Sequence, residues 1–241
     1  MQSFEGYSPQ FNYRQMLQAI TEELKLPLLQ IARKAELGYM VGKPKEAAEY
    51  LYKIEQNANS AIRLIDSYLL GLELADSQQS LALEPVSLGS VLSEAAHQLS
   101  PSAKQNNVEL ELRITNRQPL VMGHAGALQT AILSLGSMLI LAQPKSSKRS
   151  ITLATFPKTD AMQIGIFGKQ EAVSIKEWER SQDLYGRSRQ PISALSPSNA
   201  AGIFVADTIF RAMSSGLNPS KFRKLYGFTA TMQLSRQLQL I

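Results

Sequence analysis

The chain has 241 residues, of which 44% are hydrophobic and 19% are charged, and it contains no cysteine. This length allows one large or two small domains, and the apolar content excludes an intrinsically disordered chain. The absence of cysteine excludes a disulfide framework, a thiolate zinc site and a cysteine nucleophile. The formal net charge of +5 is weak, and no basic stripe interleaved with aromatic residues indicates nucleic-acid binding.

The N-terminal region has no basic segment followed by an apolar one, and we identify no apolar run of spanning length elsewhere. We therefore expect no signal peptide and no membrane insertion in this chain. A cysteine-free chain of this kind fits a reducing compartment, and the expected location is cytoplasmic.

Residues 11–37 are predicted to form one long helix. Apolar residues recur at steps of three and four, as in a heptad seam, at Leu17, Ile20, Leu24, Leu28, Ile31 and Ala35. Pro27 should kink this helix, because proline removes a backbone donor and clashes with the preceding turn. Gly38, Gly42 and Pro44 then indicate a short connection.

A second predicted helix follows, and its seam consists of Ile54, Ala58, Ala61, Ile65, Leu69 and Leu72. Because the connection is short, the two helices should pack antiparallel. A hairpin of two helices leaves each apolar stripe partly uncovered, and a second copy would complete a four-helix bundle. We therefore predict that residues 1–76 form a homodimeric helical-hairpin domain. In the alternative arrangement, the rest of the same chain covers the stripe.

The pattern changes after residue 76. Residues 77–86 are polar and include Pro85, which indicates a linker, and residues 87–241 are predicted to form a second domain. Helical patterns occupy residues 88–99, 127–139 and 198–213, and strand patterns occupy residues 108–114, 151–156, 162–167 and 228–234. This order predicts an α+β sandwich with helices on one face of a mixed sheet. Residues 168–197 are predicted to be a long irregular segment.

Three short segments carry a family resemblance. The first helix contains Thr21-Glu22-Glu23-Leu24-Lys25-Leu26-Pro27-Leu28, and later segments read Glu84-Pro85-Val86-Ser87-Leu88 and Leu120-Val121-Met122-Gly123-His124. In this order they resemble the H-box S-H-E-L-R-T-P-L, the entry to the ATP-binding domain and the approach to its N-box in bacterial sensor histidine kinases. The resemblance covers about residues 11–235 and implies a dimerisation bundle followed by a GHKL-type ATP-binding domain.

The resemblance also implies a phosphoacceptor histidine on the first helix, where this sequence has Glu22. A carboxylate is a poor substitute for the imidazole that takes up the γ-phosphoryl group. The two histidines of the chain, His97 and His124, both fall in the second domain and are interpreted as surface or capping residues.

The three motifs of the implied ATP site depart from the family pattern as well. Ser134 and Met138 stand where the family has asparagines, one of which binds Mg²⁺. The D-x-G-x-G motif corresponds to Gly165-Ile166-Phe167-Gly168 and its surroundings, which lack the aspartate that binds adenine. Of the G-x-G-L-G-L motif, which lets the backbone approach the phosphates, only Gly202 remains. A degenerate nucleotide site is therefore expected, with no catalytic residue, no cofactor and no metal.

These departures favour a non-catalytic signalling protein, a pseudokinase of a two-component pathway. Its partner would be a response-regulator receiver domain or a partner histidine kinase, because the family docks the receiver on this part of the bundle. The candidate docking residues are Glu22, Glu23, Lys25, Leu26 and Leu28. The alternatives are a divergent ATP-binding histidine kinase, a phosphotransferase relay, and a remodelled cavity that senses a small metabolite.

Overall fold

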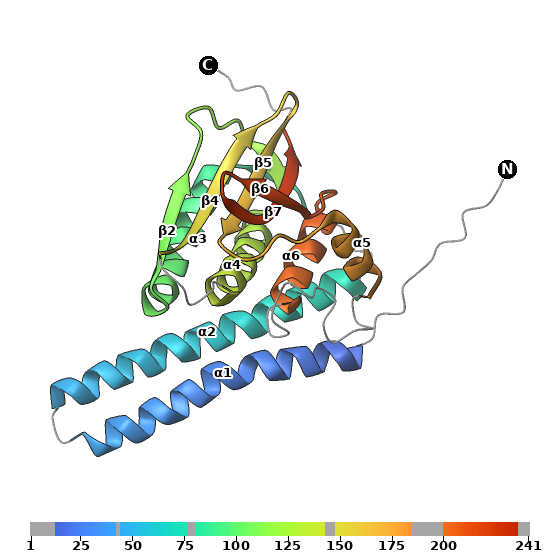
Figure 1. The fold of residues 1–241 in the computed structure, drawn as a ribbon. Coiled ribbons are helices and arrows are strands. Elements are labelled where there is room, and N and C mark those ends of the chain that lie inside the picture. The colour runs from blue at the N-terminus through green and yellow to red at the C-terminus, as the bar shows by residue number, and fades with distance from the viewer. Residues whose placement is uncertain (1–12, 42–43, 77–80, 143–147, 185–199, 236–241) are drawn as a thin grey trace.

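The computed structural model describes residues 13–41, 44–76, 81–142, 148–184 and 200–235. Two long helices, α1 (Tyr13–Met40) and α2 (Pro44–Asp76), form a hairpin that lies below an α/β domain in the view of Figure 1. The predicted fold class, a helical hairpin followed by an α/β sandwich, is confirmed.

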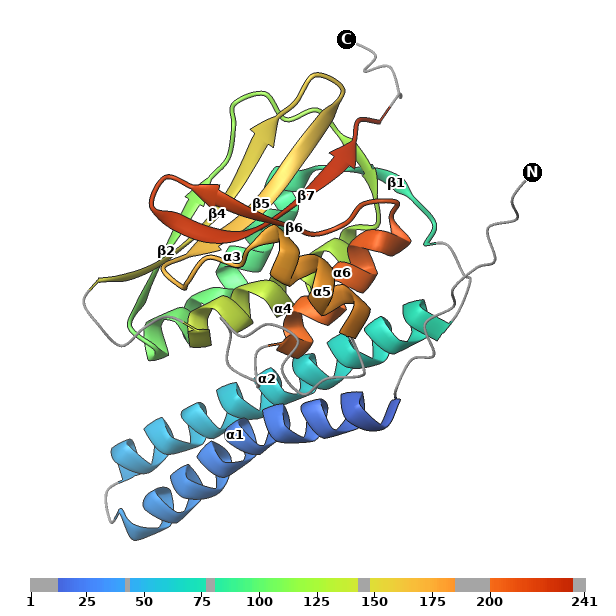
Figure 2. The same ribbon diagram turned by 45° about the vertical axis from the view of Figure 1, so that its right-hand side comes forward.

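Helix α1 continues through Pro27 without interruption. Its ribbon bends near the middle of the helix in both Figure 1 and Figure 2, as expected where a proline removes a backbone hydrogen bond. Pro44 is the first residue of α2, a position where the missing N–H has no intrahelical partner to lose.

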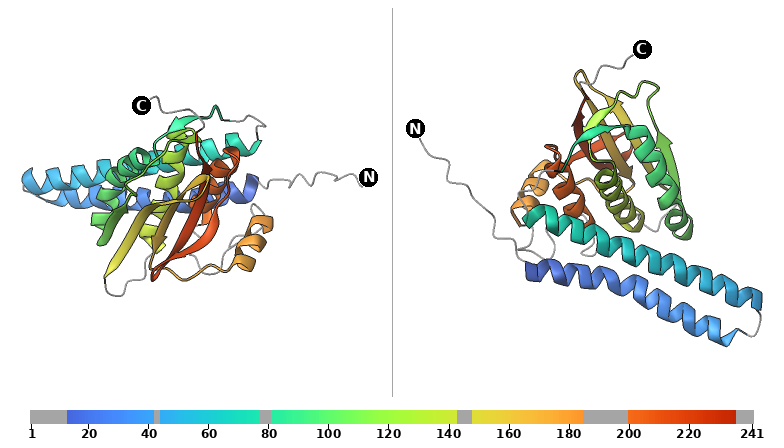
Figure 3. Two further views of the ribbon diagram at one scale, coloured as in Figure 1. Left: turned by 90° about the horizontal axis from the view of Figure 1, so that it is seen from above. Right: turned by 180° about the vertical axis from the view of Figure 1, so that it is seen from behind.

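The α/β domain contains a five-stranded mixed sheet with the strand order β2-β4-β5-β7-β6. Its strands are β2 (Val108–Arg113), β4 (Arg149–Pro157), β5 (Ala161–Gly168), β6 (Asn218–Phe222) and β7 (Leu225–Gln233). Only the β2–β4 pair is parallel. One face of the sheet is covered by α3 (Leu88–Gln105), α4 (Ala125–Ala142) and α6 (Ala200–Ala212), as Figure 3 shows from behind.

The structure adds four short elements to those predicted. Strands β1 (Glu84–Val86) and β3 (Val121–Gly123) pair antiparallel, so the end of the predicted linker is a strand. Strand β6 and helix α5 (Ile175–Leu184) were also missed, and α5 lies inside the segment predicted to be irregular. Residues 77–80 of the linker and 185–199 of that segment lie outside the described residues.

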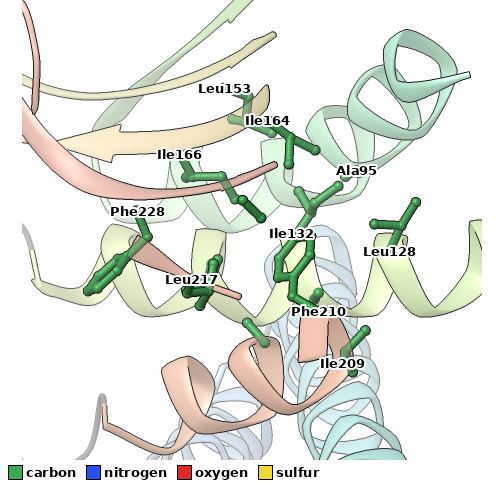
Figure 4. Close-up of a cluster of buried hydrophobic side chains, with 14 of the residues drawn as sticks. Ala95, Leu128, Ile132, Leu153, Ile164, Ile166, Ile209, Phe210, Leu217 and Phe228 are labelled. Carbon is green, nitrogen blue, oxygen red and sulfur yellow. The ribbon is translucent and has the colours of Figure 1, made fainter. Parts of the chain in front are cut away.

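The core of the α/β domain lies between the sheet and the three helices. Side chains alternate between the two faces of a strand, so Leu153, Ile164, Ile166 and Phe228 all point toward the helices. Figure 4 shows them meeting residues of α3, α4 and α6. Each such side chain, when fully buried, contributes about 1.5–3 kcal/mol. The domain therefore has a core of its own.

Helix α4 is the described helix that is long and apolar enough to cross a membrane by length and composition. Its 18-residue window has a mean hydropathy of 1.7, which the sequence analysis missed because Gln129, Thr130, Ser134 and Ser137 interrupt the run. More than half of this window is buried inside the protein, where α4 packs between α3 and α6. A helix buried in the core of a protein can have the same length and apolar composition.

Candidate functional site: the helical hairpin and the α4–α6 contact

The contact between α1 and α2 uses part of the predicted seam, namely Leu24, Ile31, Ile54 and Ala61, together with residues outside it. The less exposed residues of α1 include Leu24, Pro27, Ile31, Lys34 and Gly38, and those of α2 include Ala47, Tyr50, Ile54, Asn57 and Ala61. Both sets follow heptad steps of three and four. We call these residues the inner seam. A Cβ atom on Gly38 would lie 3.2 Å from the Cβ atom of Tyr50, which fixes the register of the two helices.

Several residues of the predicted seam are instead exposed, so that part of the prediction is wrong. Leu28 is 56% exposed and Leu69 is 53% exposed, and Ala35 and Ile65 are exposed too. Each helix carries a second apolar stripe, and apolar spacing alone does not reveal which stripe faces the other helix of the same hairpin. We call the exposed set the outer stripe: Leu28, Ala32, Ala35 and Tyr39 on α1 with Leu51, Ile62, Ile65 and Leu69 on α2.

The candidate docking residues occupy two successive turns of α1. Lys25 is exposed, as is Leu28 of the outer stripe, so both are available to a partner. The side chains of Glu22, Glu23 and Leu26 lie outside the described residues.

The C-terminal part of α2 packs against the α/β domain. A Cβ atom on Gly71 would lie 3.3 Å from Cγ2 of Val205 on α6, so the two helices approach closely at that point. Leu70 and Leu74 of α2 pack against the core of the α/β domain. The alternative in which the same chain covers the hairpin therefore holds for this end of α2, while the outer stripe stays exposed.

Three of the five residues predicted for the degenerate nucleotide site meet where α4 and α6 come into contact. A Cβ atom on Gly202 would lie 2.9 Å from the carbonyl oxygen of Ser134 and 3.3 Å from Cβ of Met138. Ser134 and Met138 are both buried. The Ser134 hydroxyl has no hydrogen-bond partner among the described residues. Magnesium prefers hard oxygen ligands, so the thioether of Met138 does not replace an asparagine there.

Phe167 and Gly168 do not join this cluster. Phe167 points to the opposite face of the sheet, where its ring centroid lies 6.0 Å from that of Phe156 and 5.4 Å from that of Phe222. Gly168 ends β5 and pairs with Ile151 and Tyr226 of the neighbouring strands. The five residues are therefore split between the two faces of the sheet and its end.

The aromatic cluster on the outer face of the sheet also holds charged groups. The guanidinium groups of Arg113 and Arg223 lie 6.0 Å and 5.4 Å from the ring centroid of Phe222. Arg113 donates a hydrogen bond to Glu111, which lowers the pKa of the Glu111 carboxyl and raises the pKa of Arg113. Arg113 is thus held against both Phe222 and Glu111, while its Nε has no hydrogen-bond partner among the described residues.

The interpretation of the two histidines is confirmed. His124 Nδ1 accepts a hydrogen bond of 3.2 Å from the backbone N–H of Ala127 and thus caps α4. His97 is exposed on α3. Neither histidine lies on the hairpin. Within the described ranges, no group of three His, Cys, Asp or Glu side chains is placed to hold a metal ion.

One buried anchor was not predicted. Asp207 on α6 accepts hydrogen bonds of 3.1 Å from the backbone N–H of Leu217 and 2.8 Å from Nε of Arg211. Trp178 of α5 donates a hydrogen bond of 3.0 Å to the carbonyl oxygen of the same Leu217. This arrangement ties α5 and α6 to the segment before β6, so Asp207 and Trp178 have a structural role.

A helical hairpin followed by three helices on one face of a mixed five-stranded sheet is the fold of the cytoplasmic core of sensor histidine kinases, with its GHKL-type domain. The solved histidine kinase AdeS of Acinetobacter baumannii is similar over 88% of this chain and 98% of its own, with a TM-score of 0.54 and 13% identity.

Two further kinases have the same arrangement. Full-length ShkA in complex with AMPPNP has a TM-score of 0.56 at 12% identity, over 90% of this chain and 46% of its own. ThkA in complex with the response regulator TrrA has a TM-score of 0.54 at 11% identity, over 92% of this chain and 62% of its own. No protein-family model and no curated protein matches the sequence. At these identities the likeness confirms the predicted resemblance at the level of the fold.

Proposed function

We propose that this chain is a cytoplasmic, non-catalytic histidine-kinase-like protein of a two-component pathway. One observation carries this function: the fold is retained, while Glu22 stands where the resemblance implies the phosphoacceptor histidine. Fold alone does not define activity, so the residues at the implied site decide the question.

The chemistry of those residues supports loss of phosphorylation. Phosphoryl transfer from ATP relies on metal ions that bridge and neutralise the phosphates and on a positioned acceptor. At the α4–α6 contact, Met138 offers no hard ligand and Gly202 packs directly on Ser134. On α1, Glu22 offers a carboxylate in place of an imidazole. Donor and acceptor sites have therefore both lost the groups that the reaction needs.

A second copy of the chain is the first proposed partner. The outer stripe leaves large apolar side chains in water on both helices, and Tyr39 is 94% exposed. Exposed apolar surface of this extent marks an interaction site. A homodimer in which two hairpins form a four-helix bundle would bury it.

A response-regulator receiver domain or a partner histidine kinase is the second proposed partner. The similar kinase ThkA was solved in complex with a response regulator, which supports this class of partner. The proposed docking surface consists of two turns of α1 with Glu22, Glu23, Lys25, Leu26 and Leu28. Of these residues, Lys25 and Leu28 have described side chains, and both are exposed.

The loss of phosphorylation is tested with γ-labelled ATP and Mg²⁺. The wild-type chain should take up no label, and Mg·ATP should leave its Tm unchanged. A ligand that binds only the folded state would add about 2.7 kcal/mol at one hundred times its Kd. The variant Glu22→His should stay unlabelled because the metal ligands are also missing. Labelling of wild type would overturn the proposal, and labelling of Glu22→His alone would show that the nucleotide site works.

The docking surface is tested by calorimetric titration with receiver domains from the same organism. Lys25→Glu should weaken binding at least about fivefold, as for residues that cost more than 1 kcal/mol at an interface. Lys45→Glu makes the same charge change near the hairpin turn and should leave binding unchanged. If Lys25→Glu and Lys45→Glu weakened binding equally, the docking surface would not lie on this part of α1.

The alternative function is a divergent ATP-binding histidine kinase or a phosphotransferase relay. The similar kinase ShkA was solved with AMPPNP, so a protein of this fold holds a nucleotide analogue. A shift of Tm with Mg·ATP favours the divergent kinase. Acid-labile phosphate on the chain after incubation with a phosphorylated receiver favours the relay.

A further inference from the structure

The turn between β6 and β7 folds across the face of the sheet that no described helix covers. Strands β2 and β6 are the two edges of this sheet. Even so, the guanidinium group of Arg113 on β2 lies 6.0 Å from the ring centroid of Phe222 at the end of β6. Figure 2 shows the β6–β7 turn bent across the sheet toward β4. The bend brings Phe222 within 5.2 Å of Phe156 and 5.4 Å of Phe167, measured between ring centroids, and we call these three rings the aromatic floor.

The aromatic floor is closely packed and uneven. A Cβ atom on Gly165 would lie 2.5 Å from the ring of Phe167, so this glycine leaves the space in which the ring lies. Phe167 is only 1% exposed, and Phe156 and Phe222 are half-buried. The planes of the Phe156 and Phe222 rings are inclined by 57° to each other. The floor therefore offers apolar contact for an aliphatic side chain, but no flat platform for a planar one.

Three cationic residues lie around the aromatic floor, close to Glu111. Arg223 and Lys224 form the two-residue turn between the paired residues Phe222 and Leu225, and both are exposed. The side chain of Arg113 is 36% exposed and donates a hydrogen bond to Glu111. This hydrogen bond lowers the pKa of the Glu111 carboxyl most strongly, and the charge of Arg223 lowers it as well. The rim of the floor therefore carries more positive than negative charge.

The chemistry of the turn does not account for the cation at Arg223. This residue has a φ of 55°, in the left-handed region of the backbone. Tight hairpin turns favour Asn, Asp or Gly at such positions, because these residues adopt a positive φ readily. The ring of Phe222 lies 5.4 Å from the Arg223 guanidinium and attracts it, but a ring accepts none of its hydrogen bonds in the plane. The five N–H donors of Arg223 find no acceptor among the described residues.

We propose that the aromatic floor and its cationic rim bind an extended acidic segment of a partner protein. In an extended chain, side chains at positions i, i+2 and i+4 point to one side over about 13 Å. An aliphatic side chain at the middle position rests on Phe222, and carboxylates at the outer positions accept hydrogen bonds from Arg113 and Arg223. Nε of Arg113 is covered by the chain itself, so Nη1 makes the contact with the partner.

Shape and charge favour an acidic protein segment over a single-stranded nucleic acid. Bases bind by stacking on open aromatic faces, which the inclined and half-buried rings of the floor do not offer. Glu111 at the rim would also repel a phosphate backbone. The site belongs to the α/β domain and lies apart from the candidate docking residues on α1, so it is independent of the proposed function.

Fluorescence anisotropy of a labelled peptide on the full chain tests the site. The probe carries the segment Glu-Ser-Leu-Ser-Glu between flexible ends, and a control peptide has Gln in place of each Glu. Wild type should bind the acidic probe, more weakly as salt is added, and should not bind the control peptide. Arg223→Asn should weaken binding at least about tenfold, because it removes a charge-assisted contact. Its Tm should stay equal or rise, because Asn tolerates a positive φ.

Arg180→Asn is the matched control, because it removes the same charge from an exposed position on α5 and should leave binding unchanged. Lys224→Gln should weaken binding about threefold and decides the question if Arg223→Asn fails to fold by circular dichroism. No binding of the acidic probe to wild type, or equal losses in Arg223→Asn and Arg180→Asn, would overturn the site. Tighter binding of a single-stranded oligonucleotide than of the probe would overturn it in favour of nucleic acid. Lys25→Glu should leave probe binding unchanged, which separates this site from the docking surface on α1.

Discussion

The hairpin and the α/β domain bury their side chains to very different extents. In the α/β domain, Ile132, Phe210 and Phe228 are at most 1% exposed and belong to one continuous core. In the hairpin, no residue of α1 with a described side chain is fully buried. The α/β domain therefore has a closed core of its own, while α1 leaves each of its described side chains at least partly in contact with solvent.

A substitution at Gly227 in the sheet of the α/β domain should cause the greatest loss of stability. A Cβ atom on Gly227 of β7 would lie 1.9 Å from the carbonyl oxygen of Ile166 on β5, and backbone cannot move there without breaking the strand pair. Gly227→Ala should therefore cost about 3 kcal/mol or more. Gly216→Ala, where nothing lies within 4 Å, should change stability by about 0.5 kcal/mol at most. Urea unfolding followed by circular dichroism measures both, and equal losses would contradict this account.

The next comparison sets a core residue against an outer-stripe residue. Phe228→Ala should cost about 3–5 kcal/mol at any protein concentration, because it empties a closed core. Leu69→Ala should have little effect in dilute solution and a larger one as concentration rises, because this side chain is 53% exposed in one chain and would be covered in the proposed dimer. The measurement is the Tm of each variant against protein concentration. A concentration-independent Tm for wild type would show that the outer stripe stays in water.

A third change separates the two regions. Gly71 lets α2 approach Val205 on α6, so a larger side chain acts as a wedge. Gly71→Leu should cost about 1–3 kcal/mol and loosen the hairpin from the α/β domain. Gly71→Ala places one carbon 3.3 Å from Cγ2 of Val205, a tight contact that a shift of a few tenths of an ångström relieves, and should do less. Limited proteolysis of the connection near residues 77–80 reports the loosening. Identical cleavage of both variants and wild type would mean that this contact does not hold the regions together.

The α/β domain could be predicted from the sequence because its signals are local and strong. Alternation predicted β4 and β5, and 3.6-residue periodicity predicted α3, α4 and α6. Strand β6 was missed because Asn218–Phe222 contains a proline and does not alternate, and it forms only by pairing with β7. Strands of three residues, such as β1, are too short for an alternation of apolar and polar residues to predict them.

The hairpin could be predicted as two helices, but the faces that they use were predicted only in part, at Leu24, Ile31, Ile54 and Ala61. Both stripes of each helix have heptad spacing, and the choice between them follows from packing that no single helix encodes. For the same reason Lys34 and Asn57 gave no signal, since each reads as an ordinary polar residue until its face is known. Ser134, Met138 and Gly202, which the resemblance assigns to the candidate nucleotide site, lie together where α4 meets α6. The sequence did not show that Phe167 lies away from this cluster, because neighbouring residues of a strand point to opposite faces of the sheet.

The pH dependence of the free energy of unfolding should change least, and it arises from Lys34 in the hairpin. Desolvation first, and then the charge of Lys53, lowers the pKa of Lys34 in the folded state. Between that lowered pKa and the ordinary lysine value, the unfolded chain binds more protons than the folded one. The free energy of unfolding therefore increases as pH rises through this window, and below it the protonated side chain keeps a constant cost.

Lys34→Met removes that cost, so the variant should be slightly more stable than wild type at neutral pH, and its advantage should shrink as the pH becomes alkaline. Lys53→Met removes only the second cause and should give a smaller change in the same direction. Urea unfolding across this pH range, at one fixed protein concentration, measures both. An advantage of Lys34→Met that does not vary with pH would mean that the Lys34 ammonium reaches solvent.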